Sequence, residues 1–111
     1  MFEIKGDKAP GPDGFNGTFF QKNWDLVGQE VTNAIMFFFQ NSKLQPEWNA
    51  TAITLIPKTH NPSTMKDFRP ISCCNTLYKC IAKVLANRIK PLLPSLISNN
   101  QAAFIKGRNY R

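Results

Sequence analysis

The chain has 111 residues, enough for one small domain, and its fourteen Lys and Arg against seven Asp and Glu give a net charge of +7. That charge favours a polyanionic partner, nucleic acid above all, although a basic surface kept for solubility is the alternative. A hydrophobic fraction of 42% argues against wholesale disorder, and three cysteines without CxxC spacing argue against a disulfide framework or a zinc site, so reduced thiols inside the cell are expected.

A turn-dense loop comes first. Residues 6–17 hold four of the six glycines and two prolines. Gly permits positive φ and Pro fixes the first position of a turn, so this segment predicts tight turns. Its centre could cradle a phosphate through backbone N–H groups beside Lys8. The alternative is an ordinary double turn, which the pattern alone favours.

A long helix is predicted next, from an N-cap at Thr18 to a stop at Asn41 and Ser42. Apolar residues recur at steps of three and four and form one stripe, which indicates a buried helix face. Phe37 and its two neighbours broaden that face. The stripe consists of Phe20, Trp24, Val27, Val31, Ile35 and Phe38.

Two strands are predicted after a connection at Pro46 and Trp48. Residues 51–56 are rich in β-branched side chains, and Pro57 ends them. Residues 68–72 form a shorter strand, which Pro70 restricts to an edge or a strand end. The polar residues between the two segments predict a hairpin with a long loop.

A second helix is predicted from a cap at Asn75 or Thr76, and Pro91 and Pro94 break it into shorter pieces. The order of one long helix, a β-hairpin and a second helix predicts an α+β fold. The apolar stripe of the second helix consists of Leu77, Ile81, Val84, Leu85 and Ile89.

The hairpin carries the clearest candidate for chemistry. Lys58 directly follows the first strand, and Arg69 lies near the start of the second. A hairpin would bring them together, and a Lys beside a forked Arg suits a polyphosphate. The alternative is an unrelated pair of surface charges, which the spacing alone favours because surface Lys and Arg are common.

Other motifs point away from catalysis within the chain. There is no P-loop, GxSxG or HExxH pattern, and the aspartates are scattered, without the close pair that a two-metal site needs. The pair Gly107 and Arg108 would suit a nucleic-acid backbone, with a solvated basic tail as the alternative. No apolar run reaches the roughly 20 residues of a membrane span, so no membrane partner is expected.

Five segments, in this order, resemble the opening blocks of reverse transcriptases from non-LTR (LINE-type) retrotransposons, particularly those of plants. The resemblance covers nearly the whole chain, and the ordered set is far more specific than any single block. The segments are KAPGPDGF (8–15), FFQKNW (19–24), WNATAITLIPK (48–58), DFRPISCCNTLYKCIAKVLANRIK (67–90) and LLPSLISNNQAAFIKGR (92–108).

The resemblance implies that residues 1–111 are a partial reverse transcriptase domain, the fingers with the start of the palm in a right-hand polymerase fold. It implies that Lys58 and Arg69 contact the triphosphate of an incoming dNTP. It also implies that RNA template and DNA primer run along two other groups of residues. These are Lys8, Gly11, Asp13 and Gly14 near the amino end, and Gln101, Gly107 and Arg108 near the carboxyl end.

The parent enzyme implied by the resemblance is an RNA-directed DNA polymerase that uses Mg²⁺. The family's metal-binding carboxylate blocks would lie beyond Arg111, so the expectation is a truncated chain that holds no metal and is inactive alone. A retrotransposon product is expected in the nucleus or cytoplasm, and the sequence does not define an oligomeric state. Two alternatives stay open, a non-enzymatic basic nucleic-acid-binding module and a non-functional product of a decayed element.

Overall fold

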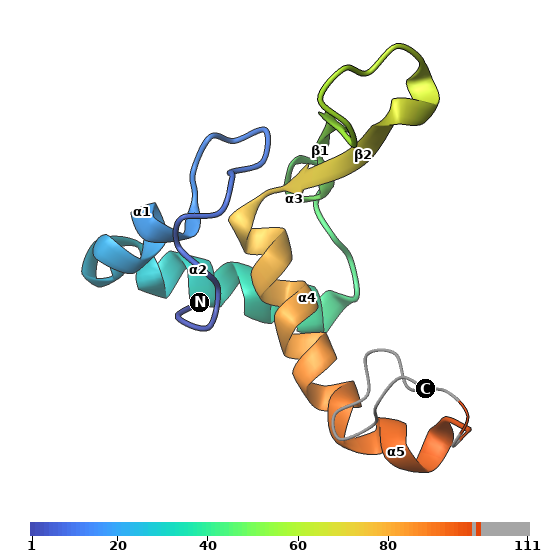
Figure 1. The fold of residues 1–111 in the computed structure, drawn as a ribbon. Helices are drawn as coiled ribbons and strands as arrows, with labels where there is room; N and C mark the ends of the chain where they lie inside the picture. The colour runs from blue at the N-terminus through green and yellow to red at the C-terminus, as the bar shows by residue number, and fades with distance from the viewer. Residues whose placement is uncertain (99, 101–111) are drawn as a thin grey trace. The chain divides into compact units, whose positions relative to one another are not determined.

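The computed structural model describes residues 1–98 and 100. Its elements confirm the predicted α+β class, with an antiparallel β-hairpin between helical segments (Figure 1). The chain divides into two compact units, Met1–Cys80 and Ile81–Arg111. In chain order the elements are α1 (Gly17–Lys22), α2 (Trp24–Asn41), α3 (Pro46–Asn49), β1 (Thr51–Pro57), the 3₁₀ turn η1 (Met65–Asp67), β2 (Phe68–Cys74), α4 (Thr76–Ile89), the 3₁₀ turn η2 (Lys90–Leu92) and α5 (Leu93–Leu96).

The single long helix predicted from Thr18 is wrong, because two helices, α1 and α2, replace it. Asn16 rather than Thr18 caps α1, and its side-chain oxygen accepts from the Phe19 N–H at 3.0 Å. At Asn23 the backbone leaves helical geometry, and the side-chain amide donates to the Phe19 carbonyl at 2.8 Å. Such a local bond competes with the helix, so a new helix begins at Trp24.

The end of α2 is confirmed at Asn41. Ser42 adopts the left-handed conformation, with φ of 54°, and its N–H donates to the Phe38 carbonyl at 2.8 Å. This arrangement satisfies one of the last carbonyls of the helix.

The predicted apolar stripe faces inward for the most part. Val31 is buried, and the other five members of the stripe are half-buried. The Trp24 indole covers Gly28 so closely that a Cβ there would lie 2.8 Å from the ring, and the Phe2 ring meets it edge-on at 5.6 Å. Phe37 departs from the prediction because its side chain is 40% exposed.

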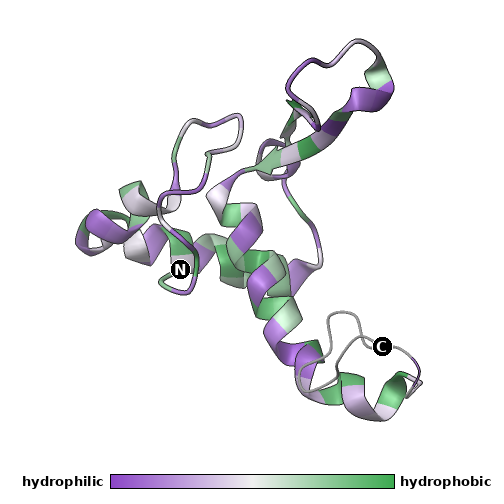
Figure 2. Cartoon of the chain, viewed as in Figure 1, coloured by the Kyte–Doolittle hydropathy of each residue, from purple (hydrophilic) through white to green (hydrophobic). Residues whose placement is uncertain are grey.

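The predicted hairpin is confirmed, with Thr51 opposite Cys74 at one end and Pro57 opposite Phe68 at the other. Its closing loop is mainly polar (Figure 2). The connection at Pro46 is itself a helical turn, α3, with the proline at its start, where a missing N–H is harmless.

The hairpin is poorly covered. Every residue of β1 is exposed, Ile53 by 70%. Among the described residues, the only buried hydrophobic side chains are those of Val31, Cys80 and Ile81. Exposed apolar surface of this kind is typical of a site that binds another molecule or another part of a protein.

The second unit contains the rest of α4, together with η2 and α5. Pro91 lies at the start of η2 and Pro94 at the start of α5, so the predicted break at these prolines is confirmed. In the part of the chain that the structure describes, no helix is long and apolar enough to cross a membrane.

Candidate nucleotide and nucleic-acid interface

The hairpin brings Lys58 and Arg69 to the same end of the sheet. Arg69 pairs with Ile56, and the Lys58 N–H donates to the Asp67 carbonyl at 2.7 Å, so the ladder continues one residue past β1. Side chains alternate between faces with a period of two, which puts Lys58, Ile56 and Arg69 on one face. Diagonal neighbours on one face of an antiparallel pair lie about 7–8 Å apart, close enough for both to reach one polyphosphate.

Asp67 supplies the only carboxylate within the hairpin, and the loop uses it. Its Oδ2 accepts from the N–H groups of Ser63 at 2.9 Å and Thr64 at 3.0 Å, and from both hydroxyls. These backbone bonds, first that of Ser63 and then that of Thr64, lower the pKa of Asp67 below its ordinary value. The carboxylate is therefore committed to closing the loop and capping η1.

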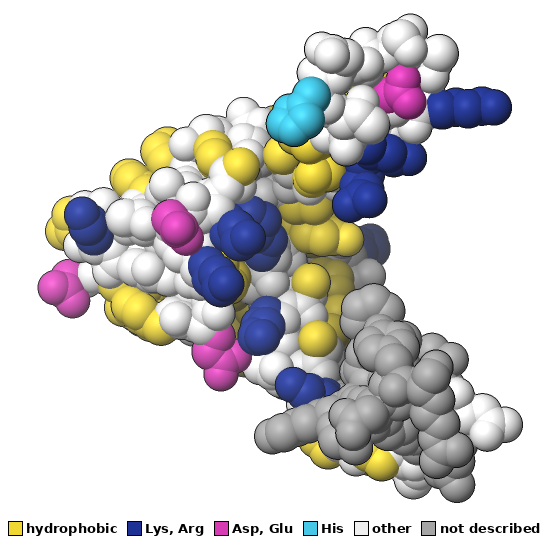
Figure 3. All heavy atoms as spheres, in the orientation of Figure 1, with side chains coloured by type: hydrophobic (Ala, Val, Ile, Leu, Met, Phe, Trp, Pro, Cys, Tyr) yellow, Lys and Arg dark blue, Asp and Glu magenta, His cyan; other side chains and the backbone are white. Residues whose placement is uncertain are grey.

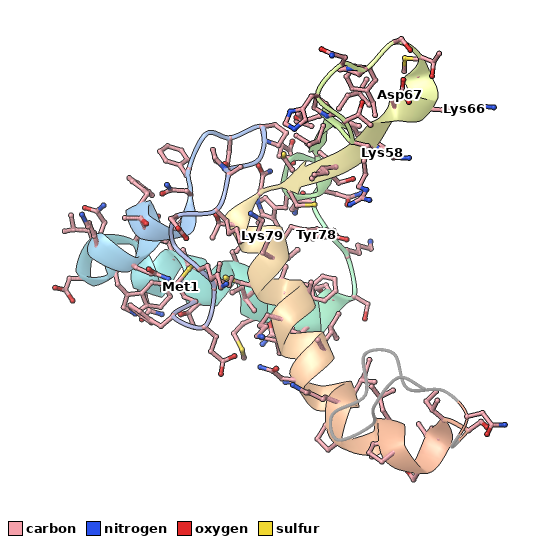
Figure 4. All side chains as sticks on the ribbon, viewed as in Figure 1. Met1, Lys58, Lys66, Asp67, Tyr78 and Lys79 are labelled. Carbon is pink, nitrogen blue, oxygen red and sulfur yellow. The ribbon has the colours of Figure 1, made fainter. Side chains whose placement is uncertain are left out.

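Exposed positive charge gathers at this end of the hairpin. Lys58, Lys66 and Arg69 are all exposed. Figure 3 shows basic side chains around the end of the hairpin beside one acidic side chain, and Figure 4 shows Lys58 and Lys66 extending outward on the same side. Lys66 was not among the predicted contacts. Its place three residues before Arg69, at the turn into β2, was the available signal.

The turn around Gly11–Phe15 is closed by two local hydrogen bonds. The Gly14 N–H donates to the Gly11 carbonyl at 3.0 Å around Pro12 and Asp13, and the Phe15 N–H donates to the Asp13 carboxylate at 2.9 Å. Gly14 has φ of +80°, a conformation that suits Gly. The ordinary double turn therefore describes this segment.

Three backbone N–H groups of this segment are already used within the protein, so a phosphate cradle beside Lys8 stays a prediction for the others. The three are the N–H groups of Asp13, Gly14 and Phe15. The Lys8 side chain beside this turn is exposed. Gly11 is needed for another reason, because a Cβ there would collide with the backbone N of Asn75.

The first turn of α4 grips this loop. Asn75 Oδ1 accepts from the Asp13 N–H at 3.1 Å, and Thr76 Oγ1 donates to the Phe15 carbonyl at 2.9 Å. Lys79 Nζ donates to the Ala9 carbonyl at 3.0 Å (labelled in Figure 4). We call Asn75, Thr76 and Lys79 the loop clamp.

Asn75 occupies the predicted cap position, and its carbonyl accepts the first helical bond, from the Lys79 N–H at 3.1 Å. Its side chain does something else, because Oδ1 accepts from Asp13 and Nδ2 donates to the Glu47 carbonyl at 3.0 Å. Asn75 and Thr76 were predicted only as alternative caps, because no sequence signal marks a partner 61 or 62 positions away.

The described residues do not fit a metal centre. Within residues 1–98 and 100, no group of three or more His, Cys, Asp or Glu side chains could hold an ion. Cys73, Cys74 and Cys80 are free thiols, and burial raises the pKa of Cys80. The candidate contacts Gln101, Gly107 and Arg108 lie outside the described residues.

Comparison with known proteins identifies a matching family and a relative. Residues 56–111 match the family described as reverse transcriptase (RNA-dependent DNA polymerase). The chain is also 31% identical over 102 residues to a protein of Xenopus laevis named transposon TX1 uncharacterized 149 kDa protein. That alignment covers 92% of this chain and 8% of the relative. The family match includes Lys58, Arg69 and the loop clamp.

Proposed function

Because this chain belongs to the reverse transcriptase (RNA-dependent DNA polymerase) family, we propose that residues 1–111 form the fingers, with the start of the palm, of a right-hand polymerase. The predicted kinship with LINE-type retrotransposon proteins is confirmed, whereas the plant subgroup stays a prediction. The chain spans 8% of the length of the Xenopus laevis relative. Polymerase activity of a longer protein is therefore proposed here. Family membership favours this function over a stand-alone nucleic-acid-binding module.

The hairpin end is proposed to bind the triphosphate of an incoming dNTP. The observation that carries this is the placement of Lys58 and Arg69 on one face of a paired ladder, while the carboxylate of Asp67 is bonded into the loop. The guanidinium can grip two phosphate oxygens, and the ammonium adds a point charge. Both neutralise negative charge that develops during phosphoryl transfer.

RNA template and DNA primer are proposed to lie along the amino-terminal loop and the carboxyl-terminal residues. In the loop, Lys8 would contact phosphate, while Gly11, Asp13 and Gly14 give the turn its shape. The residues proposed for the carboxyl end are Gln101, Gly107 and Arg108. The net charge of +7 supports a polyanionic partner.

The metal chemistry of nucleotide addition is proposed to depend on ligands other than the described residues, because these do not fit a metal centre. Mg²⁺ is the ion expected for the parent enzyme. We therefore propose that the 111-residue chain alone does not extend a primer. Template-dependent extension by this chain, with Mg²⁺ and dNTPs supplied, would refute that statement.

Titration of the chain with dTTP at low salt, followed through backbone amide NMR signals, tests the phosphate grip. The expected result is saturable shifts around Lys58 and Arg69, which the double variant Lys58→Met/Arg69→Met loses. A matched control is Lys22→Met/Lys43→Met, which removes two exposed charges elsewhere. Equal dTTP affinity in both double variants would reject the grip.

A further inference from the structure

We propose that Asn75 and Thr76 are positioning residues, which hold the Gly11–Phe15 turn at the end of β2. The geometry keeps the nucleic-acid contact of Lys8 in a fixed relation to Arg69, which β2 carries. This inference rests on the proposed function, since it concerns how two of its contact regions are aligned.

Asn75 and Thr76 follow β2 without a linker. β2 ends at Cys74, Asn75 follows directly, and α4 begins at Thr76. Whatever these two side chains hold is therefore fixed to the end of β2. Their partners in the turn are 62 and 61 positions away in the sequence, so the bonds join two distant parts of the chain.

The side chains of Asn75 and Thr76 are both buried. Asn75 is 4% exposed and Thr76 is 1% exposed, and both polar atoms of the Asn75 side chain are hydrogen-bonded. Buried polar groups that are fully satisfied specify one geometry, because any other arrangement leaves a buried donor or acceptor without a partner. Gly11 lies so close to the Asn75 backbone that even a methyl group would not fit between them.

The side chain of Asn75 does not cap α4. An Asn before the first residue of a helix ordinarily bonds an N–H in the first turn of that helix. Here its side chain instead joins the loop to α3, through Asp13 and Glu47. Lys79 adds a bond to Ala9, the neighbour of Lys8, so both flanks of the loop are tied to α4.

A salt titration distinguishes positioning from mere stability. The affinity of the chain for an RNA–DNA primer–template hybrid is measured by fluorescence anisotropy over a range of KCl. The slope of log affinity against log salt counts phosphate contacts, at about 0.7–0.9 per contact. Removing one fixed contact therefore lowers the magnitude of the slope by about 0.7–0.9. A change in the stability of the chain alone leaves the slope unchanged.

The key variant is Thr76→Val, which keeps the shape of the side chain and removes only the hydroxyl. We expect it to lower the slope as much as Lys8→Met does, although it removes no charge. The double variant should show no further decrease, because both changes remove one contact. Thr76→Ser, which retains the hydroxyl, should keep the wild-type slope.

The outcomes separate the inference from the function on which it rests. A wild-type slope in Thr76→Val, alongside a lowered slope in Lys8→Met, overturns the inference and leaves the proposed function standing. An unchanged slope in Lys8→Met overturns the nucleic-acid contact and with it the inference. Should Thr76→Val fail to fold, amide hydrogen exchange of the wild-type chain decides, since exchange of the Asp13 N–H at the rate of a free peptide would also overturn it.

Discussion

The backbone N–H of Lys58 donates to the carbonyl oxygen of Asp67 at 2.7 Å, one residue beyond the last residue of β1. Asp67 therefore has two roles, because its carbonyl keeps Lys58 in the ladder while its carboxylate closes the loop. The position of a candidate phosphate ligand thus depends on the integrity of this loop.

Acid should loosen the hairpin loop. The pKa of Asp67 is lowered in the folded chain from the ordinary 3.8, so its stabilising contribution is present above pH 3.8 and is lost as the pH falls through the lower folded value. The amide signals of Ser63 and Thr64, followed by NMR on descending from pH 5, should move with a midpoint below 3.8. In Asp67→Asn this transition should be absent, and its persistence there would contradict the assignment.

The charge-preserving exchange Arg69→Lys should weaken dTTP binding, because a Lys cannot make the forked contact of a guanidinium. We expect a loss on the order of tenfold, as for one charge-assisted hydrogen bond. Lys58→Arg keeps a donor and a charge, and should change the affinity less. Isothermal titration calorimetry of both variants checks this asymmetry, and the opposite ranking would mean that Lys58 is the main ligand.

Gly11→Ala should destabilise the chain by roughly 1–3 kcal/mol, because the added methyl group meets the backbone of Asn75. Gly14→Asn is the comparison, since the space there is open and only the positive φ opposes a side chain, which Asn tolerates better than most residues. It should lower the free energy of unfolding by less than Gly11→Ala does. Urea denaturation measures both, and equal losses would argue against the tight contact.

Asn16→Ala should cost about 1 kcal/mol through the loss of the α1 cap. Thr18→Ala should cost less, because Thr18 lies inside α1 and caps nothing. Urea midpoints for the two variants test which residue begins the helix. A greater loss from the Thr18 variant would restore the boundary that the sequence predicted.

Ile53→Thr should reduce self-association without unfolding the hairpin. Ile53 is 70% exposed, and Thr keeps the β-branched shape that suits a strand. Light scattering at rising protein concentration should show less aggregation, while the stability changes by less than about 0.5 kcal/mol. Ala50→Thr, at an exposed position outside the strands, controls for polarity alone.

The hairpin was predictable because its signals are local. The β-branched run of β1, its end at Pro57 and the polar loop all lie within a short window. The break at Asn23 was not predictable, because the apolar stripe continues across it and the side-chain bond to Phe19 leaves no mark in the hydrophobic pattern. Periodicity detects a helix face and does not detect a competing local hydrogen bond.

The candidate site divides in the same way. The sequence indicated that a hairpin would join Lys58 and Arg69, and the register agrees, while their role as a phosphate grip stays a prediction. The loop clamp was hidden because its bonds span 61 to 70 positions. A polar residue before a helix looks like a cap whether its side chain bonds the helix or a distant turn.

Two prolines of the hairpin also affect what can join it. The hydrogen-bonded Lys58–Asp67 pair fixes the alternation along the ladder, so Pro57 and Pro70 both lie at positions whose N–H would point away from the partner strand. The β1–β2 ladder therefore loses no hydrogen bond, but the outer edge of each strand lacks one N–H donor. A third strand pairing with either outer edge would miss one hydrogen bond, which disfavours extension of the sheet. The two faces of the hairpin are not affected.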